Sequence, residues 1–141
     1  MINIIHKYMN TPITLIFATV YSVLFLGLTF VVINYRQKNK IILGDANQPA
    51  LTHRIRAHGN TAEYGPLAIL LVLIGELNKV NSSYLIVAAS LFMIGRIIYT
   101  FTTIALHSNP KVGGIRILGM TLTLVSIITL VIFLLIKALY A

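Results

Sequence analysis

RIRAHGNTAEYGP, residues 54–66, places two arginines, an asparagine, a glutamate and a tyrosine at the entrance to an apolar helix. On a helix with about 100° per residue, five polar side chains of this region fall within an arc of about 100°. This polar stripe consists of His53, Arg56, Asn60, Glu63 and Tyr64. Polar groups are costly in a bilayer, so the polar stripe indicates either a functional site or a contact between helices.

The rest of the chain is apolar enough to lie in a membrane. Of its 141 residues, 57% are hydrophobic and only 10% are charged, whereas soluble domains carry about 25% charged residues. The sequence therefore predicts an all-α integral membrane protein, a four-helix bundle in which residues 1–141 form a single domain. The net charge of +8 is scattered along the chain. This pattern is typical of membrane topology and anionic lipid, and it argues against nucleic-acid binding.

Four segments are predicted to be helices, at about 11–35, 50–79, 82–106 and 114–139. The first, third and fourth are long enough to cross roughly 30 Å of hydrocarbon. The second is purely apolar only over residues 67–77, so its polar first turns must lie in a protein interface or among the headgroups. Turns are expected at Gly44-Asp45 and at residues 47–49. Basic residues gather after the first and third spans, which predicts that both termini lie outside and that the polar stripe faces the cytoplasm.

A second polar face lies on the third span. Its members share the spacing i, i+3, i+4 and are Arg96, Tyr99, Thr100, Thr103 and His107. Arg96 lies inside an apolar run and needs a partner. Glu63 is the expected one, because the chain has only three acidic residues and the other two lie in a loop and near the opposite surface.

Most of these residues have a structural interpretation beside the functional one. Arg56 with Glu63 is either a salt bridge that ties helices together or part of a binding site, and Arg96 is either a structural partner of Glu63 or a ligand contact. The hydroxyls of Thr100 and Thr103 are able to bond to their own helix backbone. His53 and His107 are typical of interfacial positions. The four histidines lack metal-ligand spacing, so no metal site is predicted.

The residue types of the two faces suit an anionic, peptide-like ligand. Guanidinium groups bind carboxylates, a carboxylate such as that of Glu63 binds an ammonium group, and Asn60 can both donate to and accept from a peptide amide. A cation also lowers the pKa of a nearby thiol, and Arg116 at the start of the fourth span is placed for that role. The chain has no cysteine. Any thiol must therefore come from the substrate.

These residues resemble the MAPEG family, the membrane-associated proteins in eicosanoid and glutathione metabolism. RAHGNTAEYGP at 56–66 is similar to the motif of the family's second helix, and four further stretches fit the same pattern: ILGD at 42–45, LAILLVLIGELN at 67–78, GRIIY at 95–99 and IRILG at 115–119. The likeness covers nearly the whole chain. It implies a homotrimer of four-helix protomers in the bacterial inner membrane. It also implies glutathione as a co-substrate bound between protomers at the cytoplasmic side.

Carried over by position, the resemblance assigns roles to individual residues. The implied glutathione contacts are Arg56, Asn60, Glu63 and Tyr64 on the second span and Arg96 and Tyr99 on the third. Arg116 matches the arginine that stabilises the thiolate. Arg36 and His58 point away from the polar stripe and are assigned to the ligand of a neighbouring protomer. Thr103 stands where some eicosanoid members have a second tyrosine, which argues against leukotriene synthesis.

The expected function is that of a glutathione-dependent membrane transferase or peroxidase acting on lipophilic electrophiles. Two alternatives stay open. One is a non-catalytic membrane trimer that binds a thiol or a lipid, and the other is a small transporter. Four-helix drug exporters usually centre a carboxylate within the membrane, and the first span here has none. The sequence does not identify the electrophile, and it does not distinguish conjugation from peroxide reduction or isomerisation.

Overall fold

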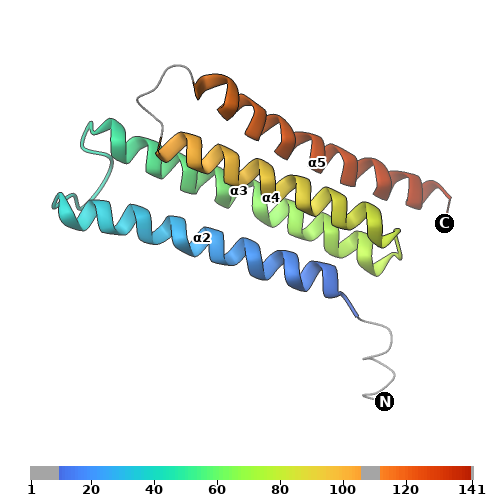
Figure 1. Cartoon of the computed structure of the whole chain (residues 1–141). Helices are drawn as coiled ribbons and strands as arrows, with labels where there is room; N and C mark the ends of the chain where they lie inside the picture. The colour runs from blue at the N-terminus through green and yellow to red at the C-terminus, as the bar shows by residue number, and fades with distance from the viewer. Residues whose placement is uncertain (1–9, 106–111, 141) are drawn as a thin grey trace, which may run out of the picture.

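The structure, a computed structural model, describes residues 10–105 and 112–140 and is an all-α bundle of four helices (Figure 1). The helices are α2 (Pro12–Lys38), α3 (Pro49–Leu77), α4 (Ser82–Ile104) and α5 (Gly113–Leu139). The start of α2, the turn between α3 and α4 and the end of α5 lie at one end of the bundle. The loop between α2 and α3 lies at the other end, with the start of α5. The four predicted helices are confirmed, and the first continues past residue 35 to Lys38.

Helix α4 is the central helix of the bundle. Half of the residues in its most apolar 18-residue stretch are buried, whereas the corresponding share is 17% in α2 and in α5. Three aromatic rings hold α2 against α4. Phe17 meets Phe92 edge-on with 5.7 Å between ring centroids, and Tyr21 lies 5.8 Å from the same ring. The Tyr21 hydroxyl also donates to the carbonyl of Thr61, which fixes α3 beside this cluster.

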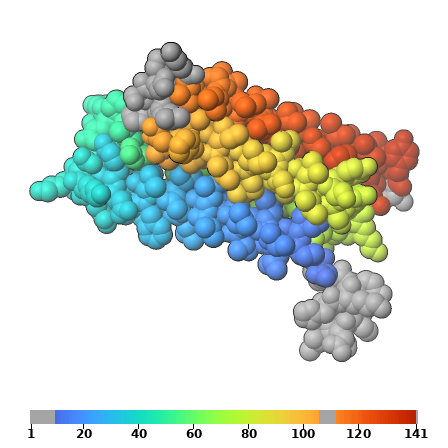
Figure 2. Space-filling view, in the orientation of Figure 1, coloured from blue at the N-terminus to red at the C-terminus, as the bar shows by residue number. Residues whose placement is uncertain are grey.

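The outer surface of the bundle is apolar. Helices α2, α4 and α5 carry large hydrophobic side chains that are exposed over most of their length, and Figure 2 shows these helices forming most of one face. The same three helices are long and apolar enough to cross a membrane, whereas α3 does not qualify although it has 29 residues. An exposed apolar surface of this extent requires lipid around it. The chain is therefore a membrane protein, and α3 is its polar helix, as predicted.

Helices α4 and α5 approach each other closely at two glycines. A Cβ atom on Gly95 would lie 2.8 Å from the carbonyl oxygen of Gly119 and 2.9 Å from the backbone nitrogen of Thr123. A Cβ atom on Gly119 would lie 2.7 Å from the backbone nitrogen of Tyr99. Small residues at such a crossing let two helix backbones touch, which is how helices associate in lipid. The crossing sets the distance between α4 and the side chains of the first turns of α5.

Glu76 fastens α3 to the first turn of α2. Its carboxylate accepts from the backbone N–H of Ile13 at 2.9 Å, from that of Thr14 at 2.8 Å and from the Thr14 hydroxyl at 2.7 Å. These donors are groups that the start of a helix leaves without a partner, and a negative charge there is favoured by the helix dipole. The Glu76 carboxylate therefore stabilises the contact between α2 and α3, at the end of the bundle opposite the polar stripe.

The loop between α2 and α3 is built around Asp45, where turns were predicted. The Asp45 carboxylate accepts from the backbone N–H of Asn47 at 3.0 Å and from the Thr52 hydroxyl at 2.7 Å. Gly44, Ala46 and Asn47 have φ values of 68°, 51° and 56°, so the chain reverses tightly here. The Thr52 and Asn47 hydrogen bonds hold the pKa of Asp45 below its usual value. Because the folded pKa is depressed, the loop keeps this support above the ordinary carboxyl pKa and loses it as the pH falls.

Candidate functional site

A cleft of about 720 Å³ opens between α3, α4 and α5 at the end of the bundle that carries the basic loop. Helix α3 supplies Arg56, Asn60 and Glu63 of the polar stripe, and α4 and α5 supply Tyr99 and Arg116. These are five of the nine predicted site residues, and they come from three helices that the sequence could not place side by side. The volume lies in the range of small-molecule sites. With His53, four of the five polar-stripe residues line this cleft, and Tyr64 does not.

Arg96 lies beneath the cleft and is fully buried. Its guanidinium carbon is 4.8 Å from the centroid of the Tyr99 ring and 5.4 Å from that of Tyr64, which are cation–π distances. Its Nη1 donates to the carbonyl of Asn60 at 3.2 Å, and its Nε donates to the Thr123 hydroxyl at 3.1 Å. One side chain therefore ties α3, α4 and α5 together under the site, and it fixes Tyr64 and Tyr99 in place.

The expected ion pair between Arg96 and Glu63 is wrong. The Arg96 guanidinium points into the contact between α3 and α5, where a backbone carbonyl and a hydroxyl oxygen accept its hydrogen bonds. Glu63 is exposed on the rim of the cleft, so its carboxylate does not reach that position. Arg56 is exposed on the same rim and forms no salt bridge with Glu63. Arg56 and Glu63 therefore line the cleft without a charged partner among the described residues.

The cleft also holds polar atoms with no partner. Within residues 10–105 and 112–140, the Thr103 hydroxyl and the Nε of Arg116 are buried and form no hydrogen bond. The Nη2 of Arg116 reaches only a distant carbonyl, that of Thr102 at 3.5 Å. A buried polar atom without a partner costs about 1–3 kcal/mol, and native proteins rarely leave one without a reason. A ligand that accepts from Arg116 and bonds to Thr103 would remove that cost.

Tyr99 is set up to donate into the cleft. The side-chain amide of Asn60 donates from Nδ2 to the Tyr99 hydroxyl. The Tyr99 hydroxyl accepts this hydrogen bond, and its own O–H remains available to donate another. The Oδ1 of Asn60 remains an acceptor. The pair therefore presents one donor and one acceptor side by side, which matches the two groups of a peptide bond.

Arg36 and His58 lie outside this cleft. Arg36 donates to the carbonyl of Ile42 at 3.3 Å in the loop after α2. The His58 ring stacks on Phe25 at 4.7 Å between centroids, and its Nε2 lies 3.0 Å from the Thr29 hydroxyl. Both point away from the polar stripe, as expected. Their assignment to the ligand of a neighbouring protomer stays a prediction.

Thr103 is the residue that the sequence interpretation undervalued. The sequence places it on the polar face of the third span, with a hydrogen bond from its hydroxyl to its own backbone as the alternative interpretation. In the structure Thr102 does so, donating to the carbonyl of Ile98 at 2.7 Å. Thr103 and Thr100 have no such partner in the described part of the chain. The spacing of Thr103 one turn after Tyr99 was the available clue. His53 also lines the cleft, whereas His107 lies outside the described residues.

Positive charge dominates the site. Three guanidinium groups, those of Arg56, Arg96 and Arg116, lie at or directly below the cleft, against the single carboxylate of Glu63. Arg96 has no acidic partner among the described residues, so its buried charge is offset by neutral oxygens, the Met120 sulfur and aromatic rings. An arrangement of this kind favours a ligand with more negative than positive groups.

Comparisons with known proteins give one family. The model of the MAPEG family matches residues 14–136. The inner membrane protein YecN of Escherichia coli strain K12 is 27% identical to this chain over 89 residues, which are 63% of this chain and 68% of that protein. YecN of Escherichia coli O6:H1 has the same identity and coverage. No solved structure matches the chain. Since the family model covers most of a four-helix membrane protein with this polar stripe, the chain belongs to the MAPEG family.

Proposed function

We propose that this protein is a glutathione-dependent transferase or peroxidase of the bacterial inner membrane that acts on lipophilic electrophiles. The observation that carries the proposal is the charge balance of the cleft, which has three guanidinium groups and one carboxylate. Glutathione has the complementary set: two carboxylates, one ammonium group, two amides and a thiol. Arg56 and Glu63 on the rim suit a carboxylate and the ammonium group, and Asn60 with Tyr99 suits an amide.

Arg116 is the residue proposed to stabilise the thiolate. Its Nε is buried and has no partner among the described residues, so a thiolate there would complete its hydrogen bonding. A guanidinium group beside a thiol favours the ionised form and lowers the thiol pKa. Bound glutathione supplies the nucleophilic sulfur. Arg116 and Thr103 hold that sulfur at the junction of α4 and α5, and the rate gain comes from thiolate stabilisation and proximity.

We also propose that three copies of the chain assemble and that the site faces the cytoplasm. The cleft opens on the end of the bundle where Arg36 and Lys38 lie in the last turn of α2 and Lys40 follows it. The other end carries Lys79 and Lys137 among the described residues. The excess of basic residues at the cleft end favours a cytoplasmic location under the positive-inside rule. A homotrimer accords with the family and leaves the apolar outer faces of the helices for neighbouring copies and lipid.

A conjugation assay distinguishes the proposed function from its two alternatives. Purified protein in detergent with glutathione and chlorodinitrobenzene should form the conjugate at a rate well above that of the same mixture without protein. In vesicles containing the protein, no uptake of either compound should exceed that of empty vesicles. Uptake without conjugation would support a transporter, and binding without conjugation or peroxidase activity would support a non-catalytic trimer.

A further inference from the structure

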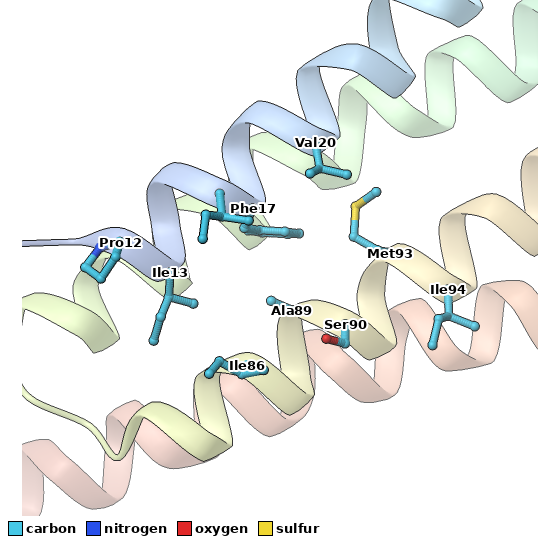
Figure 3. Close-up of a pocket in the computed structure, with 10 residues that line it drawn as sticks. Pro12, Ile13, Phe17, Val20, Ile86, Ala89, Ser90, Met93 and Ile94 are labelled. Atoms are coloured by element: carbon cyan, nitrogen blue, oxygen red, sulfur yellow. The ribbon is translucent and has the colours of Figure 1, made fainter.

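A second depression lies at the opposite end of the bundle from the cleft. It is a groove of about 490 Å³ between α2 and α4 (Figure 3). Ile13, Phe17 and Val20 form its α2 wall, and Ala89, Ser90 and Met93 form its α4 wall. The Ser90 hydroxyl is the one polar side-chain group among the residues that line it. The groove follows the helices for roughly 12 Å from Pro12 to Val20, at about 1.5 Å per residue.

The groove continues into a polar mouth at the ends of the helices. The adjoining depression has about 580 Å³ and shares Pro12, Ile13 and Ile86 with the groove. Its remaining wall consists of Val80 and five polar residues, Asn10, Glu76, Lys79, Asn81 and Ser82. Polar groups thus gather at the opening where the helices begin, and apolar groups line the groove that runs toward the middle of the bundle. This order of groups follows the order of a phospholipid from headgroup to acyl chain.

Among the described residues that line the mouth, Lys79 carries the charged group that has no ionic or hydrogen-bonding partner. The Glu76 carboxylate is bound by three donors of the first turn of α2, at 2.7 to 2.9 Å, and the helix dipole offsets its charge. Lys79 is exposed in the turn between α3 and α4 and forms no salt bridge with Glu76. An anion that enters the mouth meets the Lys79 ammonium group beside the side chains of Asn81 and Ser82.

We propose that this depression binds one anionic phospholipid. The phosphate lies at Lys79, and one acyl chain fills the groove between α2 and α4. The site is distinct from the cleft: the two share no residue and lie at opposite ends of the bundle. Its consequence is a lipid that fastens the start of α2 to α4, in addition to the Glu76 hydrogen bonds. The proposal does not depend on the glutathione chemistry.

Native mass spectrometry of the protein released from bilayers of equal phosphatidylglycerol and phosphatidylcholine content tests the proposal. The unmodified protein should retain one phosphatidylglycerol per chain, at least fivefold more often than phosphatidylcholine. Lys79→Gln should abolish this preference. Its matched control is Lys137→Gln, which removes a lysine at the same end of the bundle that lines neither depression.

A second pair of variants tests the acyl-chain groove. Ser90→Phe places a ring in the groove from an exposed position and should reduce retention of both lipids at least fivefold. Val87→Phe, on the lipid-facing side of the same helix and outside the groove, should leave retention unchanged. All four positions are exposed, so the variants are expected to fold, and thermal unfolding confirms it. Equal effects of Lys79→Gln and Lys137→Gln, or of Ser90→Phe and Val87→Phe, would overturn the proposal. Phosphatidylcholine retained as often as phosphatidylglycerol by the unmodified protein would overturn it as well.

Discussion

Arg116→Ala should slow glutathione conjugation about 100-fold at neutral pH, which corresponds to about 2.7 kcal/mol. The Nε of Arg116 is buried without a partner among the described residues and lines the cleft, so it is placed to meet a developing negative charge. Without the guanidinium group, the pKa of the bound thiol rises. The rate should therefore recover partly at higher pH. The measurements are the conjugation rate as a function of pH and the ultraviolet absorbance of the bound thiolate.

Two further variants show whether this effect is specific. Arg116→Lys keeps the positive charge but not the guanidinium geometry, and it should retain part of the lost rate. Arg54→Ala removes a guanidinium group that stacks on the Tyr35 ring, 4.5 Å from its centroid, and that does not line the cleft. It should leave the pH profile unchanged. If Arg116→Ala has the rate and thiolate absorbance of the unmodified protein, Arg116 has no part in the mechanism.

Gly95→Ala should destabilise the bundle by about 2 kcal/mol, because overpacking a close contact costs about 1–3 kcal/mol. The added methyl group would lie 2.8 Å from the carbonyl oxygen of Gly119 and 2.9 Å from the Thr123 nitrogen, and neither is a flexible side-chain end. Helices α4 and α5 must therefore separate. That shift moves Arg116 away from Tyr99, so glutathione binding should weaken together with stability. Thermal unfolding in detergent measures the first effect and calorimetric titration the second.

Gly27→Ala is the matched control for the helix crossing. Gly27 is exposed in α2, and a Cβ atom there would meet nothing within 4 Å. Replacing a glycine inside a helix by alanine stabilises the helix by about 0.5–1 kcal/mol when there is room for the methyl group. The two substitutions should thus change the free energy of unfolding in opposite directions. A gain in stability for both would mean that the α4–α5 contact is looser than the structure indicates.

The fold followed from the sequence because its strongest pattern is simple. Long apolar runs predict membrane helices, and the change from polar to apolar residues at Leu67 predicted that the second helix would differ from the others. The structure agrees: α3 begins at Pro49 and carries the cleft residues on its polar half. Packing was harder to foresee. The close contact of Gly95 with Gly119 depends on which faces of α4 and α5 pack together, and no local sequence pattern predicts those faces.

Five of the nine residues predicted from the sequence line the cleft, but the contacts among the site residues could not be predicted. Helical spacing placed Arg56, Asn60 and Glu63 on one face, and the cleft confirms this. The predicted ion pair of Arg96 with Glu63 was wrong. It was inferred because the chain has few acidic residues, and a buried arginine was expected to have a charged partner. In the structure a hydroxyl, a carbonyl and two aromatic rings hold the guanidinium group instead. Neutral partners of this kind are available all along any helix, so the sequence gives no sign of which ones will be used.

Arg96, buried without an acidic partner among the described residues, also affects how the cleft responds to a ligand. Its charge lies directly beneath Tyr99 and Tyr64, and it also bonds the backbone of Asn60. An anion bound above these residues would be attracted by Arg96 without touching it, since burial weakens screening by solvent. Arg96 therefore has the geometry of a positioning residue that orients the tyrosines and the asparagine, and Arg56 and Arg116 have that of direct contacts.

Calorimetric titration of the purified protein with glutathione is the most direct test of the cleft as a site for an anionic tripeptide. Glutathione should bind with a stoichiometry that the helix-crossing control Gly27→Ala preserves, and Arg56→Gln should weaken it about tenfold, or about 1.4 kcal/mol. S-methylglutathione should bind less tightly, because it offers Arg116 no thiolate. If the folded protein binds neither compound at millimolar concentration, the cleft is not a glutathione site, and its arginines serve only to hold the helices together.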